Sequence, residues 1–121
     1  MEENKVEKTL MPTSRVVEES VPGKQVTIAH VIASPVSEIF ESLGIEGRGA
    51  IGILTLSPYE TAMVAADLAA KASDVEIGFL DRFTGSVVLS GDVESVDVAL
   101  HAVTDTLERV LGFTVAEITK T

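Results

Sequence analysis

The middle of the chain carries a pattern of apolar and polar residues that predicts a hairpin followed by a helix. Two apolar segments lie within residues 75–91, on either side of a turn at Thr84 and Gly85. β-branched residues favour strands, and glycine permits the positive φ of tight hairpin turns. Asp92 then suits a helix N-cap, because its carboxylate can accept hydrogen bonds from N–H groups of the first turn. The pattern therefore predicts two paired strands and the start of a helix.

The flanking patterns extend this unit in both directions. A near-continuous apolar run over residues 50–56 predicts a strand buried on both faces. Ser57 and Pro58 suit the start of an alanine-rich helix that continues to Ala72. After the hairpin, apolar residues recur at helical spacing, Gly112 ends that helix, and residues 114–119 predict a last strand. The recurring residues are Val96, Leu100, Val103, Leu107, Val110 and Leu111.

An extra strand and a short helix precede this unit. Residues 24–33 alternate in polarity and predict a strand. Its two faces are expected to carry Val26, Ile28, His30 and Ile32 on one side and Thr27, Ala29 and Val31 on the other. We expect a helix over residues 35–43, capped by Ser34 and ended by Gly44. From residue 50 the order of elements predicts an α+β, ferredoxin-like fold: an antiparallel sheet with helices on one face.

The N-terminal segment differs from the rest of the chain. Residues 1–20 are rich in charged and polar side chains, which predicts a flexible extension. Residues 15–21 extend one residue past this segment, and their apolar content predicts one short strand. Residues 21–121 are then the folded domain.

Composition narrows the classes of partner. The 121 residues include 19 acidic and 9 basic ones, giving a net charge of −10, and such a charge disfavours nucleic acid and anionic membranes. The lack of cysteine excludes disulfides and thiolate chemistry within this chain. No apolar run approaches the roughly 20 residues of a membrane span. Since the start of the sequence also lacks the pattern of a secretory signal, we expect a cytoplasmic location.

Two histidines are the candidates for chemistry. His101, with Asp97 and Asp105 at i±4, can present three metal ligands on one helix face, but a solvated polar face is the favoured interpretation. His30 lies in an apolar strand, where a partly buried, hydrogen-bonded histidine is favoured over a catalytic base. We therefore predict no catalytic residue, no metal site, no cofactor and no enzymatic activity.

Two other short motifs have simple explanations. Asp81 and Arg82 at the end of a hairpin strand favour a local or intersubunit ion pair over catalysis. Gly47, Gly49 and Gly52 match the spacing of a dinucleotide-binding loop, but they precede a strand instead of following one, so that interpretation is rejected.

Three segments together resemble the shell proteins of bacterial microcompartments. Residues 55–72 resemble the family's alanine-rich first helix with its edge-facing lysine. Residues 75–79 and 90–96 resemble its central strand pair and the Gly-Asp-Val start of its next helix. Residues 26–35 resemble its C-terminal strand and short helix, which here stand near the N-terminus. That order, with residues 21–27 and 77–85, resembles the circularly permuted shell proteins of ethanolamine- and propanediol-utilisation compartments, over residues 15–121.

The resemblance implies a homohexameric tile that packs with other shell proteins around enzymes handling a volatile aldehyde, with those enzymes as further partners. Lys71 matches the position at the edge between hexamers. The segment that flanks the axial pore corresponds to Asp81, Arg82, Phe83, Thr84, Gly85 and Ser86. A small axial β-barrel of the permuted relatives corresponds to Val16, Val17, Glu18, Glu19, Ser20 and Val21.

Two further hypotheses come from the residues. Ferredoxin-like domains also serve as small-molecule-binding regulatory modules, which is the alternative function. Separately, four glycines lie close together where the short helix joins the core, and they predict a hinge at which the hexamer bends. These are Gly44, Gly47, Gly49 and Gly52.

Overall fold

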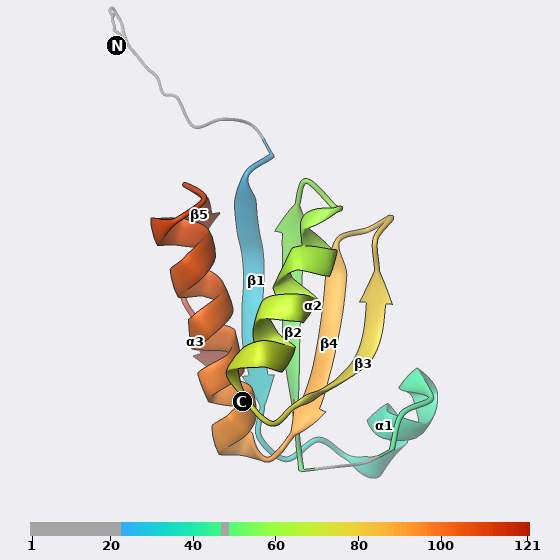
Figure 1. Ribbon diagram of the computed structural model, residues 1–121. Helices are drawn as coiled ribbons and strands as arrows, with labels where there is room; N and C mark the ends of the chain where they lie inside the picture. The colour runs from blue at the N-terminus through green and yellow to red at the C-terminus, as the bar shows by residue number, and fades with distance from the viewer. Residues whose placement is uncertain (1–22, 47–48) are drawn as a thin grey trace, which may run out of the picture.

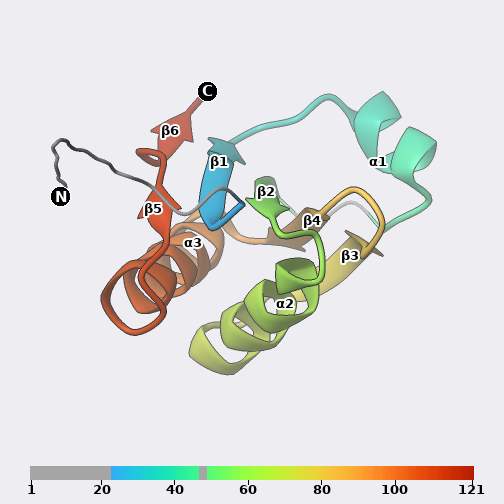
Figure 2. The same ribbon diagram turned by 90° about the horizontal axis from the view of Figure 1, so that it is seen from above.

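The computed structural model describes residues 23–46 and 49–121 and shows one mixed sheet with helices on both faces (Figures 1 and 2). Helices α2 and α3 cover one face of the sheet, which we call the helix face. The short helix α1 lies on the other, which we call the open face (Figure 2). The elements are β1 (Gln25–Ile32), α1 (Ser37–Leu43), β2 (Ala50–Ser57), α2 (Thr61–Ala72), β3 (Glu76–Asp81), β4 (Ser86–Gly91), α3 (Val93–Arg109), β5 (Thr114–Val115) and β6 (Thr119–Lys120).

The strand order is β3-β4-β2-β1-β5, and β6 also pairs with β1. In the order β3, β4, β2, β1 each strand is antiparallel to the next. Strands β5 and β6 run parallel to β1. The predicted antiparallel arrangement is confirmed for these four strands, and the parallel pairing of β5 and β6 with β1 was not predicted. The position beside β2 is taken by β1, so the C-terminal segment can pair only outside β1.

The C-terminal segment forms two strands of two residues each instead of the one strand predicted at 114–119. Both pair in the same register with β1, because Val115 lies opposite Val26 and Thr119 lies opposite His30. Between them the ladder is interrupted, and Ile118 packs against the core. The Ile118 side chain is partly buried at the point where the pairing between β1 and the C-terminal segment is interrupted.

Strand β1 lies where it was predicted, but its faces differ from the prediction. Its pairing with β2 shifts register between Val26 and Ile28. Such a bulge inserts one residue and reverses the alternation beyond it. Val26 therefore joins Ala29 and Val31 in the core, while Ile28 is 47% exposed on the opposite side.

The main core lies between the sheet and the two long helices, as the spacing predicted. Helix α3 buries Val96, Leu100, Val103 and Leu107, and α2 buries Ala62, Ala65, Ala66 and Ala69. Small alanine side chains allow α2 to approach the sheet closely. At Gly52 of β2 a Cβ atom would lie only 2.7 Å from Val96 Cγ1, so this position needs glycine for packing.

Two helix starts were predicted wrongly. Helix α1 begins at Ser37 with Val36 as its N-cap, so Ser34 and Pro35 lie outside it. Helix α2 begins at Thr61, because β2 continues through Ser57, which pairs with Gln25 of β1. Strand β2 therefore includes Ser57, the residue that resembled a cap for α2.

Helix α3 starts as predicted. The Asp92 carboxylate accepts hydrogen bonds from the Ser95 N–H at 2.9 Å and from Ser95 Oγ at 3.0 Å. Its end differs slightly, since the helix stops at Arg109 and leaves Val110 and Leu111 exposed. Gly112 then turns the chain with φ of 74°.

A smaller apolar cluster lies on the open face. Phe40 of α1 packs with Ile51 of β2 and Val88 of β4. Partly buried side chains surround them, namely Ile32, Leu43, Ile45 and Ile53. Because Ile51 belongs to this cluster and Leu54 to the main core, β2 is buried from both sides, as its apolar run predicted.

Candidate functional site

The hairpin loop over residues 81–86 is held in one shape by its own hydrogen bonds. The Asp81 carboxylate accepts from the Phe83 N–H at 2.9 Å and from Thr84 Oγ1 at 2.9 Å. The Gly85 N–H donates to the Asp81 carbonyl, and the Gly85 carbonyl accepts from the Leu56 N–H, both at 2.8 Å. The loop is thus closed on itself and fastened to strand β2.

Gly85 is required by this arrangement. Its φ is 78°, and a Cβ atom there would overlap the carbonyl oxygen of Leu56. The hairpin turn predicted at Thr84 and Gly85 is confirmed. The hydrogen bonds from the Phe83 N–H and then the Thr84 hydroxyl lower the pKa of Asp81 below its ordinary value of 3.8, because they stabilise the charged carboxylate.

The side chains at the tip of the loop point outward. The Arg82 guanidinium lies 4.9 Å from the centroid of the Phe83 ring, and Phe83 is 72% exposed. The Asp81 carboxylate is used within the loop, so the local Asp81–Arg82 ion pair that was predicted does not form in the described part of the chain. An ion pair between subunits stays a prediction.

Lys71 lies in the last turn of α2. Its Nζ atom is 2.8 Å from Asp67 Oδ2, an ion pair at i, i+4 on the helix. Both side chains are mostly exposed, so Lys71 stands at the surface where a second molecule can reach it.

His30 fastens the C-terminal segment to strand β1. Its ring nitrogens lie 2.6 Å from Thr119 Oγ1 and 2.9 Å from Thr121 Oγ1. This agrees with the prediction of a partly buried, hydrogen-bonded histidine. The partners were not predictable, because they lie about ninety positions further along the chain.

Two of the candidate metal ligands on α3 lie near each other, with His101 Nδ1 3.7 Å from Asp97 Oδ1, whereas Asp105 is paired elsewhere. His101 Nδ1 lies 3.0 Å from the Asp97 carbonyl oxygen, and Asp105 pairs with Arg109 at 2.8 Å. Within residues 23–46 and 49–121, no group of three or more acidic, histidine or cysteine side chains is arranged to hold a metal ion. In the same residues, no helix is long and apolar enough to cross a membrane.

The hinge glycines have different surroundings. Gly44 caps the end of α1 with φ of 73°, and Gly49 precedes β2 with φ of 76°. Gly52 lies inside β2 against Val96, where close packing accounts for glycine without a hinge. Gly47 lies outside the described residues, as do all the predicted barrel residues: Val16, Val17, Glu18, Glu19, Ser20 and Val21.

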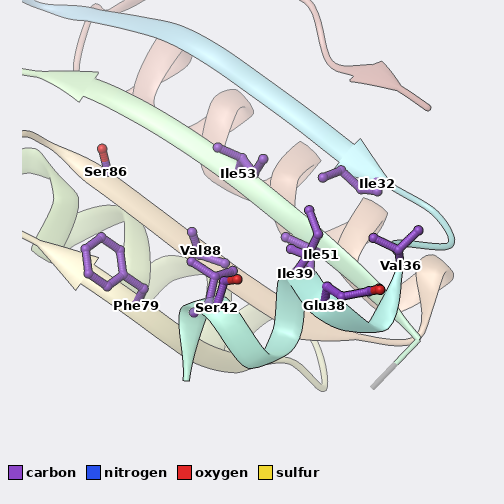
Figure 3. A pocket seen from close by; sticks show the side chains of 11 residues that line it. Ile32, Val36, Glu38, Ile39, Ser42, Ile51, Ile53, Phe79, Ser86 and Val88 are labelled. Atoms are coloured by element: carbon purple, nitrogen blue, oxygen red, sulfur yellow. The ribbon is translucent and has the colours of Figure 1, made fainter. Parts of the chain in front are cut away.

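A groove of about 710 Å³ lies on the open face between α1 and the sheet (Figure 3). Its lining is almost wholly apolar, and polar side chains come from Glu38, Ser42 and Ser86. The apolar lining residues are Ile32, Val36, Ile39, Leu43, Ile51, Ile53, Phe79 and Val88. The sequence analysis did not predict this groove. The feature of the sequence that could have indicated the groove is the presence of apolar residues on both faces of β2 and β4.

Comparison with known proteins places this fold in a family. Residues 50–119 match the BMC domain. The bacterial microcompartment shell protein CutR of Streptococcus intermedius is 50% identical over 106 residues, which cover 88% of this chain and 91% of CutR. The shell protein PduU of Salmonella typhimurium is 54% identical over 110 residues, covering 90% of this chain and 95% of PduU. EutS of Escherichia coli is 53% identical over 110 residues, which cover 91% of this chain and 99% of EutS.

Solved structures agree with the sequence comparison. A flat hexamer of CutR superimposes with a TM-score of 0.81 at 48% identity, covering 88% of this chain and 99% of CutR. A CutR structure described as a screw superimposes with a TM-score of 0.79 at 48% identity. This match covers 83% of this chain and 100% of that CutR chain. Between the two predicted functions, a shell component and a regulatory module, these relatives support the first. The chain belongs to the BMC-domain family of bacterial microcompartment shell proteins, and its function is structural, as a component of the shell.

Proposed function

We propose that this protein forms a cyclic homohexamer that packs edge to edge with other shell proteins around enzymes handling a reactive aldehyde. The observation that carries the proposal is the superposition on the CutR flat hexamer, which spans 99% of that chain. A shell component needs no catalytic site. The Asp81 carboxylate and the His30 ring nitrogens are engaged in hydrogen bonds that hold the fold together.

The order of elements supports a circularly permuted domain. The BMC domain match begins only at residue 50, so β1 and α1 precede it. Yet β1 occupies a central position in the sheet, beside β2. A strand that is integral to the sheet but precedes the matched domain is what a permutation produces.

The surface residues take roles according to their place in the fold. The loop over residues 81–86 is closed by its own hydrogen bonds and exposes Phe83, which suits a position around the axis. Lys71 is exposed in the last turn of α2, which suits an edge between hexamers. Residues 16–21 are proposed to form the axial barrel. Gly44, Gly47 and Gly49 are proposed as the hinge.

Light scattering after size exclusion tests the hexamer directly. We expect a mass of six chains at micromolar concentration, and sheets or tubes by electron microscopy at higher concentration. A strictly monomeric protein would overturn the proposal. Thermal-shift screening against amino acids and nucleotides tests the alternative, because a regulatory module is stabilised by its ligand and a tile is not.

The hinge is tested with a variant carrying Gly47→Ala and Gly49→Ala. Since alanine strains the positive φ of Gly49, we expect a changed geometry of the assembly by electron microscopy. Replacement of the exposed Ala70 by serine is the matched control, which leaves the backbone unstrained. Identical assemblies of the parent and the double variant would exclude the hinge.

A further inference from the structure

The segment that follows α3 pairs with the sheet along the outer edge of β1, on the side of the sheet opposite β3 (Figure 2). It does so through β5 and β6, two strands of two residues each, and the pairing is interrupted between them. We call residues 114–121 the arm. Because such short strands make few backbone hydrogen bonds, the arm is held less firmly than the eight-residue strands β1 and β2.

Burial of side chains ends where the arm begins. Phe113 is 8% exposed and packs in the main core, and its N–H donates to the Leu107 carbonyl at 3.0 Å. No side chain of the arm is buried to the same extent, and Val115 and Ile118 are only partly covered where they pack against the core. The arm can therefore leave the sheet while Phe113 stays in place.

The contacts between the arm and β1 are nevertheless specific. Backbone N–H groups of the arm donate to carbonyls along β1 and just before it, from Thr114 to Lys24 at 3.0 Å, from Ala116 to Val26 at 2.9 Å and from Thr121 to Val31 at 2.9 Å. The two ring nitrogens of His30 lie at hydrogen-bond distance from the hydroxyls of Thr119 and Thr121. When the arm leaves, these groups lose their partners, and the edge of β1 becomes a template for another strand.

We propose that the arm of one copy leaves its own β1 and pairs with β1 of a second copy, which gives its own arm in return. The inference goes beyond the proposed function, since the exchange involves two copies and needs no hexamer. Both arms then form the same hydrogen bonds as in the single chain. The free energy therefore changes only through the junction between Phe113 and Thr114 and through the association of the two copies.

A second copy is the partner that matches the edge of β1. Its arm places Val115 opposite Val26 and Thr119 opposite His30, so that both strand pairings and both hydroxyl contacts are restored. One similar structure is described as a CutR dimer with a domain swap. Its chain superimposes with a TM-score of 0.62 at 47% identity, covering 82% of this chain and 100% of that CutR chain. A chain with a related sequence thus exchanges a segment with a second copy.

Disulfide trapping between two variants tests the exchange, because the chain has no cysteine of its own. One variant carries His30→Cys and the other Thr119→Cys. The two are mixed, held in mild denaturant, returned to buffer and oxidised. These positions lie opposite each other in β1 and β6, so the disulfide forms only when the arm of one chain lies on β1 of the other. We expect disulfide-linked dimers whose fraction rises with protein concentration, and none from either variant alone.

The unmodified protein provides a measurement that keeps His30 and both hydroxyls in place. After the same treatment with denaturant, we expect light scattering to show a species with the mass of two chains. A double variant with His30→Cys and Thr119→Cys is oxidised at low concentration as a further check. Its disulfide should form within one chain, because the arm is then closed on its own β1.

Two matched mixtures locate the exchanged segment. In the first, Glu117→Cys replaces Thr119→Cys, and it should give few dimers because Glu117 lies between β5 and β6 and not opposite His30. In the second, Ile28→Cys is mixed with Thr55→Cys, which lies opposite it in β2. This mixture should give no dimers, because β1 and β2 of each chain stay together when only the arm is exchanged.

Four results would overturn the proposed exchange. A test mixture without dimers, beside a double variant that closes within the chain, would show that the arm stays on its own β1. Equal dimers with Glu117→Cys would show a loose contact without register. Equal dimers from Ile28→Cys and Thr55→Cys would show that β1 moves as well. An unmodified protein without a two-chain species would show that the substitutions cause the exchange. The mass of the untreated protein tests the proposed hexamer separately.

Discussion

The two faces of the sheet bury apolar side chains to very different extents. On the helix face, Leu54, Leu100 and Leu107 have no exposed surface, and two long helices cover them. On the open face, α1 covers Ile51 and Val88 through Phe40 but leaves Ile39 and Phe79 at the surface. The helix face therefore supplies most of the buried apolar surface of the folded chain, whereas the open face leaves apolar side chains exposed. The predictions below test this division.

The largest expected effect compares a leucine of the helix face with an isoleucine of the open face. Leu100→Ala removes a fully buried side chain and should lower the free energy of unfolding by about 2–5 kcal/mol. Ile39→Ala removes a side chain that is 37% exposed, and its cost in the same isolated chain should be below about 1 kcal/mol. Denaturant unfolding measured at concentrations where the chains are dissociated provides both values. Equal losses would show that the open face stabilises the chain as much as the helix face does.

The next comparison adds a methyl group on each face. A Cβ at Gly52 would lie 2.7 Å from Val96 Cγ1, in a core where the short, branched Val96 side chain has no room to move. Gly52→Ala should therefore cost about 1–3 kcal/mol. A Cβ at Gly78 would lie 2.9 Å from both Cδ1 and Cγ2 of Ile45, a side chain that is only partly buried and can shift. Gly78→Ala should cost less in thermal unfolding, and a larger loss than for Gly52→Ala would contradict the comparison.

A smaller effect compares two aspartates as the pH changes. Asp92 caps α3 on the helix face, and its hydrogen bonds from the Ser95 N–H and then the Ser95 hydroxyl lower its pKa below the ordinary 3.8. A lowered pKa in the folded protein means that the carboxylate adds stability above pH 3.8, and that this stability is lost as the pH falls below it. Asp92→Ala should lower the melting temperature by about 2–8 °C at neutral pH and by less in acid.

Asp81 provides the matched case at the loop. Its pKa is lowered by the hydrogen bonds from the Phe83 N–H and the Thr84 hydroxyl, so the sign of its pH dependence is the same. Because it orders a surface loop and not a core helix, Asp81→Ala should change the melting temperature less than Asp92→Ala. Hydrogen exchange at the Phe83 amide should nevertheless become faster. A larger drop in melting temperature for Asp81→Ala would show that the loop is part of the cooperative fold.

The smallest effect on stability is expected for an exposed ion pair on α2, which belongs to neither buried cluster. Lys71→Ala removes an exposed i, i+4 pair with Asp67, and such pairs contribute about 0.3–0.5 kcal/mol. The melting temperature and the mass of the assembly should therefore stay nearly unchanged, while extended sheets are lost if Lys71 lies at the edge between hexamers. Arg109→Ala removes the comparable pair with Asp105 and serves as the control. Sheets that persist in Lys71→Ala under electron microscopy would exclude the edge role.

Local patterns determined most of the helix face. The spacing of Val96, Leu100, Val103 and Leu107 fixed the buried side of α3, because helical periodicity depends on nearby residues alone. The cap at Asp92 and the turn at Gly85 also follow from local backbone chemistry. The start of α2 was missed because a strand that is already paired can extend through a residue that would otherwise cap a helix. The start of α1 was missed because Val36, and not Ser34, takes the N-cap position.

The sequence by itself determined the order of elements, the buried sides of the long helices and the family. Each of these depends on short-range spacing or on motifs within single segments. Only the tertiary structure decided that β1 lies beside β2, that β5 and β6 run parallel to β1, and that His30 binds Thr119 and Thr121. These pairings join residues far apart in the chain, where periodicity carries no information. The groove also could not be read from the sequence alone, since its walls come from α1 and from strands that become neighbours only in the folded sheet.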